Sequence, residues 1–216
     1  MDGVIVDSEP VHFRVEKRMF EELGIHLSDK EHAAFLGTSS QGMFGSLKER
    51  FGLEETVEAM VAEEHRRFRK EMTQEPPPLI PGVRDLARRF HLSGRPLAVA
   101  SSAPHEQIDF VLHLGGMEEF FPVRVSGDDV ERSKPHPAIF LEAARRLGRR
   151  PAECVVIEDS ENGVTAARAA GMVCIGFSSP GSMPQDLSAA DHTAASMEEV
   201  DRLLAALPKT QTEKHP

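Results

Sequence analysis

Short, mainly apolar runs alternate with helical patterns through the second half of this 216-residue sequence. Between the runs, apolar residues recur at helical spacing, and a glycine such as Gly148 follows the helical stretch. Short strands separated by helices are typical of a parallel sheet that helices cover on both faces. The sequence therefore predicts an α/β fold with a Rossmann-like, doubly wound parallel sheet. The expected strands are residues 97–100, 123–125, 154–157 and 173–176.

The first third of the chain lacks such runs, and its pattern is helical. Apolar residues recur at helical spacing in residues 11–23 and again in residues 54–72, and Gly24 follows the first stretch. A proline-rich segment, residues 76–82, then interrupts the pattern, because proline cannot continue a helix. We therefore expect a helical domain inserted into a sheet-containing core. The expected division is 1–10 and 79–208 for the core, 11–78 for the helical insert and 209–216 for a disordered tail.

The charge of the chain restricts its partners. Asp and Glu number 35 against 25 Lys and Arg, which gives a formal net charge of −10 and argues against nucleic acid or an anionic membrane. No apolar run approaches the ~20 residues that span a bilayer, and the N terminus has no signal-peptide pattern. Cys154 and Cys174 lie inside apolar runs, where buried, reduced thiols are expected. We therefore expect a soluble, cytoplasmic monomer.

Polar side chains collect after the expected strands. Ser101 and Ser102 follow one strand, Lys134 follows the next, and Glu158 and Asp159 end a third. Ligands of open α/β sheets bind beyond the carboxyl ends of the strands. Each residue alone has an ordinary explanation, because serine caps helices, lysine is often solvated and an acidic pair often forms a turn. Together they supply what phosphoryl transfer needs, namely donors and a cation for phosphoryl oxygens and carboxylates for Mg²⁺.

The N terminus connects this pattern to a known family. The first ten residues, Met-Asp-Gly-Val-Ile-Val-Asp-Ser-Glu-Pro, resemble the opening motif of the haloacid dehalogenase superfamily, Asp-x-Asp-Gly-Val followed by Asp-Ser. Asp2 matches the second aspartate of that motif. Ser101 matches the serine of the second motif, Lys134 in Ser-Lys-Pro-His-Pro the lysine of the third, and Glu158-Asp159 the acidic pair of the fourth. The sequence is most similar to the β-phosphoglucomutase-like branch, which carries a helical cap after the first motif.

The resemblance implies a role for each matched residue. Asp2 would act as general acid and base, and its backbone carbonyl would bind Mg²⁺ together with Glu158 and Asp159. The transferring phosphoryl group would lie against Lys134, Ser101 and the neighbouring Ser102. The metal and the lysine would create a local positive field inside an acidic protein.

The family's nucleophile is the aspartate immediately before the position that Met1 matches, and this sequence has no residue there. The strand that leads to that aspartate lies in the middle of the family's sheet. Without it, two rows of backbone groups stay unpaired, at about 1–3 kcal/mol for each buried group. We therefore expect the natural reading frame to continue upstream of Met1 with an apolar strand that ends in Asp. A pseudoenzyme and a structural remnant are the alternatives, and the chain as given is expected to be catalytically impaired.

The helical insert carries weaker signals. Leu36-Gly37-Thr38-Ser39-Ser40 resembles the substrate loop of the cap, and Ser40 stands where β-phosphoglucomutases have an arginine that binds a second phosphate. His12 matches a hinge histidine of mutases and phosphatases, although a histidine packed at a domain junction would look the same. The basic run at residues 65–70 is either a substrate clamp or a solvated helix face.

These observations predict a Mg²⁺-dependent phosphatase that acts on a small phosphate monoester, such as a sugar phosphate, through an aspartyl-phosphate. A sugar phosphomutase is the alternative enzyme. A non-catalytic protein that binds a phosphorylated metabolite is the alternative outside enzymes.

Overall fold

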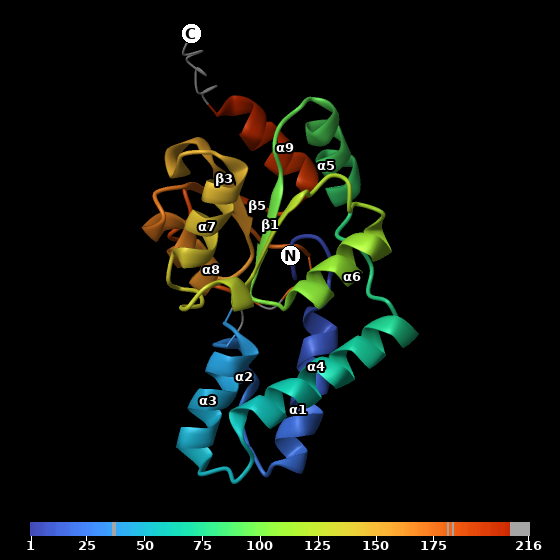
Figure 1. Cartoon of the computed structure of the whole chain (residues 1–216), viewed down its shortest axis with the longest axis vertical. Helices are drawn as coiled ribbons and strands as arrows, with labels where there is room; N and C mark the ends of the chain where they lie inside the picture. Colours follow the sequence, from blue (N-terminus) through green and yellow to red (C-terminus); the bar gives the residue numbers. More distant parts are fainter. Residues whose placement is uncertain (36–37, 181, 183, 208–216) are drawn as a thin grey trace.

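The computed structural model describes residues 1–35, 38–180, 182 and 184–207. Leu36 and Gly37 of the expected substrate loop and the expected tail, residues 209–216, lie outside the described residues. The chain forms two parts (Figure 1). The helical part consists of helices α1 to α4, and the sheet part contains the strands and helices α5 to α9.

Helices α1 to α4 form where the sequence supplies both an apolar face and a cap. Ser28, Ser39 and Thr56 each accept a backbone hydrogen bond at the start of α2, α3 and α4, respectively. Two helices were expected here, and α2 and α3 lie between them as additional elements. The helix expected from residue 54 starts three residues later because Thr56 is its cap. The bounds are α1 Glu9–Glu22, α2 Asp29–Ala33, α3 Ser40–Phe51 and α4 Val57–Gln74.

The strands confirm an α/β fold with parallel pairing, but the sheet is not continuous. Among the described residues, one sheet has the order β1-β2 and a separate sheet has the order β3-β4-β5, with every pair parallel. The last strand, β5, was not expected from the sequence because it is only three residues long and begins with two polar residues, His192 and Thr193. The bounds are β1 Ala98–Ser101, β2 Val123–Ser126, β3 Val155–Glu158, β4 Val173–Phe177 and β5 His192–Ala194.

Helices cover both faces of the two sheets (Figure 1). Helix α7 packs on β1 and β2, and α8 packs on β3 and β4, within one hydrophobic cluster. Helices α5, α6 and α9 belong to a second cluster, which continues into the helical part. The bounds are α5 Val83–Leu92, α6 His105–Gly115, α7 Ala138–Leu147, α8 Glu161–Ala169 and α9 Met197–Ala206, with short 3-10 helices at Gly127–Asp129 and Pro151–Glu153.

The N-terminal segment is a buried turn. The Met1 carbonyl accepts a hydrogen bond from the Ile5 amide at 2.7 Å, and the fully buried Val6 forms an isolated bridge with Leu79. Gly3 adopts a φ of 63°, in the left-handed region that suits glycine. This turn places Asp2 and Ser8 beside each other at the junction of the two parts.

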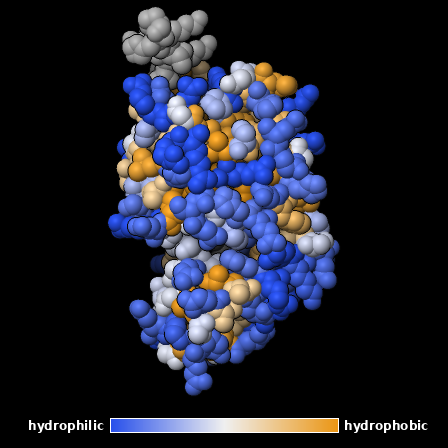
Figure 2. Space-filling view, in the orientation of Figure 1, coloured by the Kyte–Doolittle hydropathy of each residue, from blue (hydrophilic) through white to orange (hydrophobic). Residues whose placement is uncertain are grey.

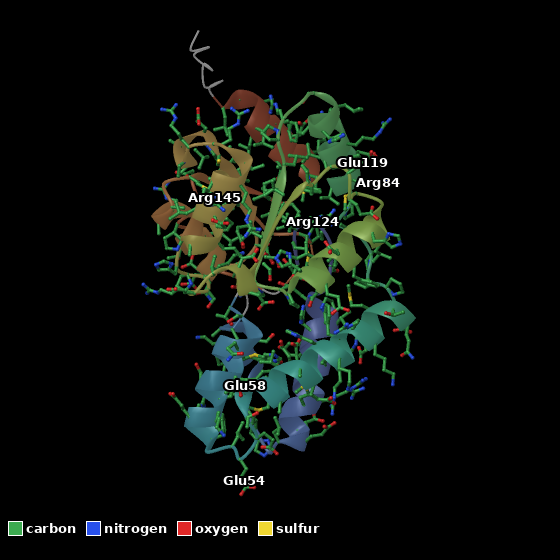
Figure 3. All side chains as sticks on the ribbon, viewed as in Figure 1. Glu54, Glu58, Arg84, Glu119, Arg124 and Arg145 are labelled. Atoms are coloured by element: carbon green, nitrogen blue, oxygen red, sulfur yellow. The ribbon has the colours of Figure 1, made fainter. Side chains whose placement is uncertain are left out.

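The face of the molecule in Figure 2 is mainly hydrophilic, with apolar residues visible in scattered patches. Glu54 lies at the end of the helical part that faces away from the sheets, and Arg145 lies on α7 of the sheet part (Figure 3). Within the described residues, every helix is too short or too polar to cross a membrane.

Candidate functional site

Asp2 lies in the N-terminal turn at the junction of the two parts. Ser8, which is fully buried, donates a hydrogen bond from Oγ to Asp2 Oδ1 at 2.5 Å. His12 Nε2 lies 3.7 Å from the same oxygen. Burial opposes ionisation of Asp2, but the nearby His12, the charge of the N-terminal ammonium and the hydrogen bond from Ser8 outweigh it and lower the pKa of Asp2. Asp2 is therefore held as a carboxylate.

His12 joins this turn to the helical part. Its Nδ1 lies 3.3 Å from Glu64 Oε1 on α4, and its ring stacks on Phe68 with centroids 3.9 Å apart. Burial would lower the pKa of His12, but hydrogen bonds with Asp2 and Glu64 and their negative charges raise it well above its usual range. The imidazolium thus lies between one carboxylate from each part of the molecule.

Lys134 and Glu158 form a buried ion pair across the two sheets. Lys134 follows β2, Glu158 ends β3, and their side chains are 5% and 6% exposed, respectively. Glu158 also accepts hydrogen bonds from the backbone amides of Asp159 at 3.1 Å and Ser160 at 3.2 Å. Burial alone would raise the pKa of Glu158, but the charge of Lys134 leads the effects that lower it. The pair therefore connects the carboxyl ends of strands that belong to different sheets.

Asp159 lies next to Glu158 without a cation of its own. Burial raises the pKa of Asp159 well above its usual range, and the charge of Glu158 raises it further. Gly3 allows this arrangement, because a Cβ at that position would lie only 1.9 Å from Asp159 Oδ2. Gly163 has the same role for Glu158, since its Cβ would lie 2.0 Å from the Glu158 carboxyl carbon. The two carboxylates are thus packed directly against glycine backbone.

The donor set at this edge fits a hard divalent cation. Asp159, Glu158 and the backbone of the Asp2 turn offer oxygen ligands, which Mg²⁺ prefers. Burial and the charge of Glu158 raise the pKa of Asp159, so its ionised form would be favoured by a cation bound beside it. A different cluster has side-chain ligand atoms that converge more tightly: among the described residues, His12, Glu16 and Glu64 have such atoms within 4.8 Å of one another. There His12 and Glu16 already contact Glu64 and His32, respectively.

Ser101 and Ser102 follow β1, as the sequence predicted. Ser101 is buried, and its Oγ accepts a hydrogen bond from the Ala103 amide at 3.2 Å. The loop after β2 packs closely on this turn, because a Cβ at Gly127 would lie 2.5 Å from the Ser102 carbonyl oxygen. The serines are therefore held by the β1-β2 sheet, whereas Glu158 and Asp159 belong to the other sheet.

The predicted residues of the helical part make local contacts. Thr38 Oγ1 donates to the Phe35 carbonyl at 2.6 Å, and Ser39 caps α3. Ser40 Oγ donates to Glu64 Oε2 at 3.0 Å, and Glu64 is fully buried. A carboxylate therefore lies beside the position where mutases have arginine.

The basic run on α4 is a set of surface ion pairs. Arg66 pairs with Glu63, and Arg67 pairs with Glu22 and Glu63. Arg69 pairs with Glu106 at the start of α6, so this arginine links the helical part to the sheet part. These contacts agree with the interpretation of the run as a solvated helix face.

Two site residues, Ser8 and Glu64, were not identified from the sequence. Ser8 belongs to the Asp-Ser continuation of the opening motif, which was a signal for it. Glu64 interrupts the apolar face of α4, whose other buried members are Met60, Phe68 and Met72. A charged residue on a buried helix face requires a partner, but the sequence does not reveal that the partners are His12 and Ser40.

Comparisons with known proteins agree with this arrangement. A sequence model of the family described as haloacid dehalogenase-like hydrolase matches residues 1–177. The phosphorylated carbohydrates phosphatase of Thermotoga maritima is 35% identical over 176 residues, which cover 80% of this chain and 79% of that protein. Hexitol phosphatase B of Escherichia coli strain K12 is 31% identical over 191 residues, covering 83% and 82%, respectively. The structure of CbbY from Rhodobacter sphaeroides in complex with phosphate superposes with a TM-score of 0.81 at 27% identity, covering 93% of each chain.

Proposed function

Because the chain belongs to the haloacid dehalogenase-like hydrolase family, we propose that it is a Mg²⁺-dependent phosphatase of small phosphate monoesters, with sugar phosphates as the substrate class. The observation that carries this proposal is the convergence of Asp2, Lys134, Glu158 and Asp159 at the carboxyl ends of the strands. The similarity to a phosphorylated carbohydrates phosphatase supports the substrate class.

The proposed organisation follows the two parts of the chain. Residues 1–10 and 79–208 are the catalytic core, and residues 11–78 are a cap that closes over it. The contacts of His12 with Asp2 and Glu64 support a cap that meets the core at the site. We propose that the enzyme works as a cytoplasmic monomer on a small phosphorylated metabolite.

Each side chain has a role that its surroundings support. Lys134 supplies positive charge for the phosphoryl oxygens, and Ser101 and Ser102 supply donors from the end of β1. Asp2 exchanges a proton with the leaving oxygen and with water, and the lowered pKa favours its base form. Asp159, Glu158 and the Asp2 carbonyl would hold Mg²⁺, which when bound supplies charge neutralisation for the phosphoryl group.

Glu64 favours a phosphatase over a mutase. A mutase must hold a second phosphate, and a buried carboxylate next to Ser40 would repel one. Arg66 and Arg69, the alternative clamps, are engaged by Glu63 and Glu106. We infer that water, rather than a second sugar hydroxyl, receives the phosphoryl group.

The nucleophile is the part of the reaction that this sequence does not contain. The family resemblance implies an aspartate directly before Met1, and we propose that the reaction proceeds through its aspartyl-phosphate. A role restricted to binding phosphorylated metabolites is the competing hypothesis.

The test uses the chain extended before Met1 by an apolar strand that ends in Asp. With Mg²⁺, this protein should release phosphate from sugar phosphates and should not interconvert glucose 1- and 6-phosphates at a comparable rate. The Asp159→Asn variant should lose most of the activity, because it removes a charged ligand from the metal site. Isomerisation that is faster than phosphate release, or full activity in the Asp159→Asn variant, would contradict the proposal.

A further inference from the structure

Helices α1 and α4 pack together in the helical part and bring one imidazole and two carboxylates close to one another (Figure 1). His12 and Glu16 lie four residues apart on α1, so their side chains lie on the same face of that helix. Glu64 lies on α4. The possible ligand atoms of these three side chains all lie within 4.8 Å of one another. We call the three residues the α1–α4 cluster.

Glu64 has one carboxylate oxygen with its hydrogen-bonding capacity unused. The side chain is fully buried, and its Oε2 accepts a hydrogen bond from Ser40 Oγ at 3.0 Å. Its Oε1 has no hydrogen-bond partner of suitable geometry among the described residues, although His12 Nδ1 lies 3.3 Å away. A buried carboxylate oxygen without a hydrogen bond is costly and unusual in a folded protein. This oxygen therefore points to a ligand that binds between Glu64 and His12.

Neighbouring polar groups hold the other two members of the cluster in place. His12 turns Nδ1 toward Glu64 and Nε2 toward Asp2, whose Oδ1 lies 3.7 Å from Nε2. Glu16 Oε2 contacts Nε2 of His32, which is buried. A histidine that binds a metal commonly presents its other ring nitrogen to a carboxylate, and carboxylates that bind a metal are themselves hydrogen-bonded. The contacts around the cluster are therefore of the kind that orient metal ligands.

The ligand types of the cluster favour a transition-metal ion over Mg²⁺. Mg²⁺ prefers oxygen ligands in octahedral geometry, as Glu158 and Asp159 can offer at the strand ends. One imidazole nitrogen with carboxylate oxygens suits Zn²⁺ and related ions, and three protein ligands leave a fourth position for water. Two carboxylates and a neutral imidazole are neutralised by one divalent ion. A loaded cluster therefore has no excess positive charge with which to hold a second phosphate.

We propose that His12, Glu16 and Glu64 bind one divalent transition-metal ion, for which Zn²⁺ is the best match. His12 binds through Nδ1 and Glu64 through Oε1, and the proton displaced from Nδ1 is released to solvent. The ion cross-links α1 to α4 beside Asp2 and stabilises the helical part. The proposal rests on the geometry of the cluster and on the unpaired oxygen of Glu64, and it holds whether or not the protein is a phosphatase.

The probe is ZnCl₂, titrated into the chain as given at about pH 7.5, where metal competes well with protons for histidine. Excess Mg²⁺ is present so that Zn²⁺ does not bind at sites with oxygen ligands alone. Isothermal titration calorimetry should show one bound Zn²⁺ per chain, and Zn²⁺ should raise the melting temperature. Co²⁺ in place of Zn²⁺ should give visible absorption without sulfur-to-metal charge-transfer bands, which excludes Cys154 and Cys174 as ligands.

Two variants locate the binding. Glu64→Gln and Glu16→Gln keep the shape of the side chain but remove an anionic ligand, and each should weaken Zn²⁺ binding at least about tenfold. Glu63→Gln is the matched control, because Glu63 lies next to Glu64 on α4, pairs with Arg66 and does not belong to the cluster. Circular dichroism checks that each variant folds. If Glu64→Gln does not fold, Glu16→Gln decides the test, since Glu16 is 15% exposed.

Several outcomes would overturn the proposal. Absence of Zn²⁺ binding, or equal binding in Glu16→Gln and in the unmodified chain, would show that the cluster is not a metal site. Asp159→Asn should bind Zn²⁺ like the unmodified chain, and loss of binding in that variant would assign the ion to the strand ends. Displacement of Zn²⁺ by excess Mg²⁺ would have the same meaning. None of these readouts requires turnover, so their failure would leave the proposed phosphatase activity standing.

Discussion

The helical part and the sheet part differ in how completely their elements are partnered. Helices α1, α3 and α4 pack together, and their buried residues, such as Phe44 and Met72, are fully enclosed. In the sheet part, β1 and β3 each retain an open edge inside the molecule. A helix satisfies its backbone within itself, whereas a strand depends on neighbours that come from elsewhere in the chain. The helices of the helical part therefore satisfy most of their own backbone groups, whereas among the described residues β1 and β3 each have one edge without a strand partner.

The carboxylates Glu158 and Asp159 at the ends of the strands are nevertheless held in place by their neighbours. Lys134 and Glu158 connect the two sheets there, and Gly3 brings the N-terminal turn against Asp159. Lys134 follows β2 and Glu158 ends β3, so each of the two sheets contributes one member of this ion pair. We therefore predict that a strand placed between β1 and β3 would add stability without requiring the rest of this edge to be rebuilt.

The largest expected effect comes from filling the space between the unpaired edges of β1 and β3. Fusing an apolar strand before Met1 should raise the free energy of unfolding by at least about 3 kcal/mol, since each new hydrogen bond contributes about 0.5–1.5 kcal/mol and apolar burial adds to it. Urea denaturation measures this change. A fused segment of equal length made of Gly and Ser is the control and should give no gain. If both fusions raised the free energy of unfolding equally, the space between β1 and β3 would not be selective for an apolar strand.

The next largest effect on stability comes from replacing a glycine by alanine, and it is compared between one glycine of the sheet part and one of the helical part. Gly163→Ala should destabilise the protein by about 1–3 kcal/mol, because its Cβ collides with the buried Glu158 carboxylate. Gly45→Ala in α3 meets no atom within 4 Å and should stabilise by about 0.5–1 kcal/mol, since alanine favours a helix. Thermal unfolding of both variants checks the opposite signs. A Gly163→Ala protein as stable as the unmodified chain would show that Glu158 is not held against α8.

The pH dependence of stability tests the contacts of His12, which join the N-terminal turn to the helical part. The folded-state pKa of His12 is raised above its usual value, so its stabilisation is complete below about pH 6.5 and is lost as pH rises through the folded value. The lowered pKa of Asp2 acts in the opposite direction, giving stability above about pH 3.9 that is lost as pH falls further.

The His12→Gln variant removes the contribution of His12 to the pH dependence of stability. In the unmodified chain, the free energy of unfolding should fall between pH 6 and pH 9 by about 1.4 kcal/mol for each pKa unit that this range covers. In His12→Gln this fall should be smaller, because the contribution of His12 is gone and only other groups with a raised folded-state pKa, such as Asp159, still lower the stability as pH rises. Urea titrations at a series of pH values measure it, and an equal fall in both proteins would assign the titration to another group.

The smallest effect concerns the surface. Arg69→Ala breaks an exposed ion pair between α4 and α6 and should cost less than about 1 kcal/mol. Arg145→Ala, on α7 of the sheet part (Figure 3), is the matched control and should behave alike. In the strand-extended chain, neither change should alter phosphate release. A selective loss of turnover in Arg69→Ala would identify a substrate contact instead of a surface pair.

Much of the sheet part could be predicted from the sequence, because its information is local. The runs that became β1, β3 and β4 are apolar and short, and Lys134 and Glu158 lie within recognisable motifs. One doubly wound parallel sheet was expected, whereas the described residues form two parallel sheets, β1-β2 and β3-β4-β5.

The rest depended on packing that no local pattern encodes. Residues 192–194 pair as β5 only because β4 presents an edge to them. Glu64 was visible as a polar residue on an apolar face, but its contacts with His12 and Ser40 arise only when α1, α3 and α4 come together. Ser39 was expected in a substrate loop, and the structure gives it a helix cap, the more common role of serine at such a position.

The most direct test measures phosphate release with Mg²⁺ from a sugar phosphate by three matched proteins. They are the chain as given, the chain extended before Met1 by an apolar strand that ends in Asp, and the same extension ending in Asn. The open sheet and the assembled acidic edge predict turnover only in the Asp-ended protein, with both extended proteins more stable than the chain as given. Equal turnover in the Asn-ended protein or in the chain as given would contradict a phosphatase site that needs only this strand and its carboxylate.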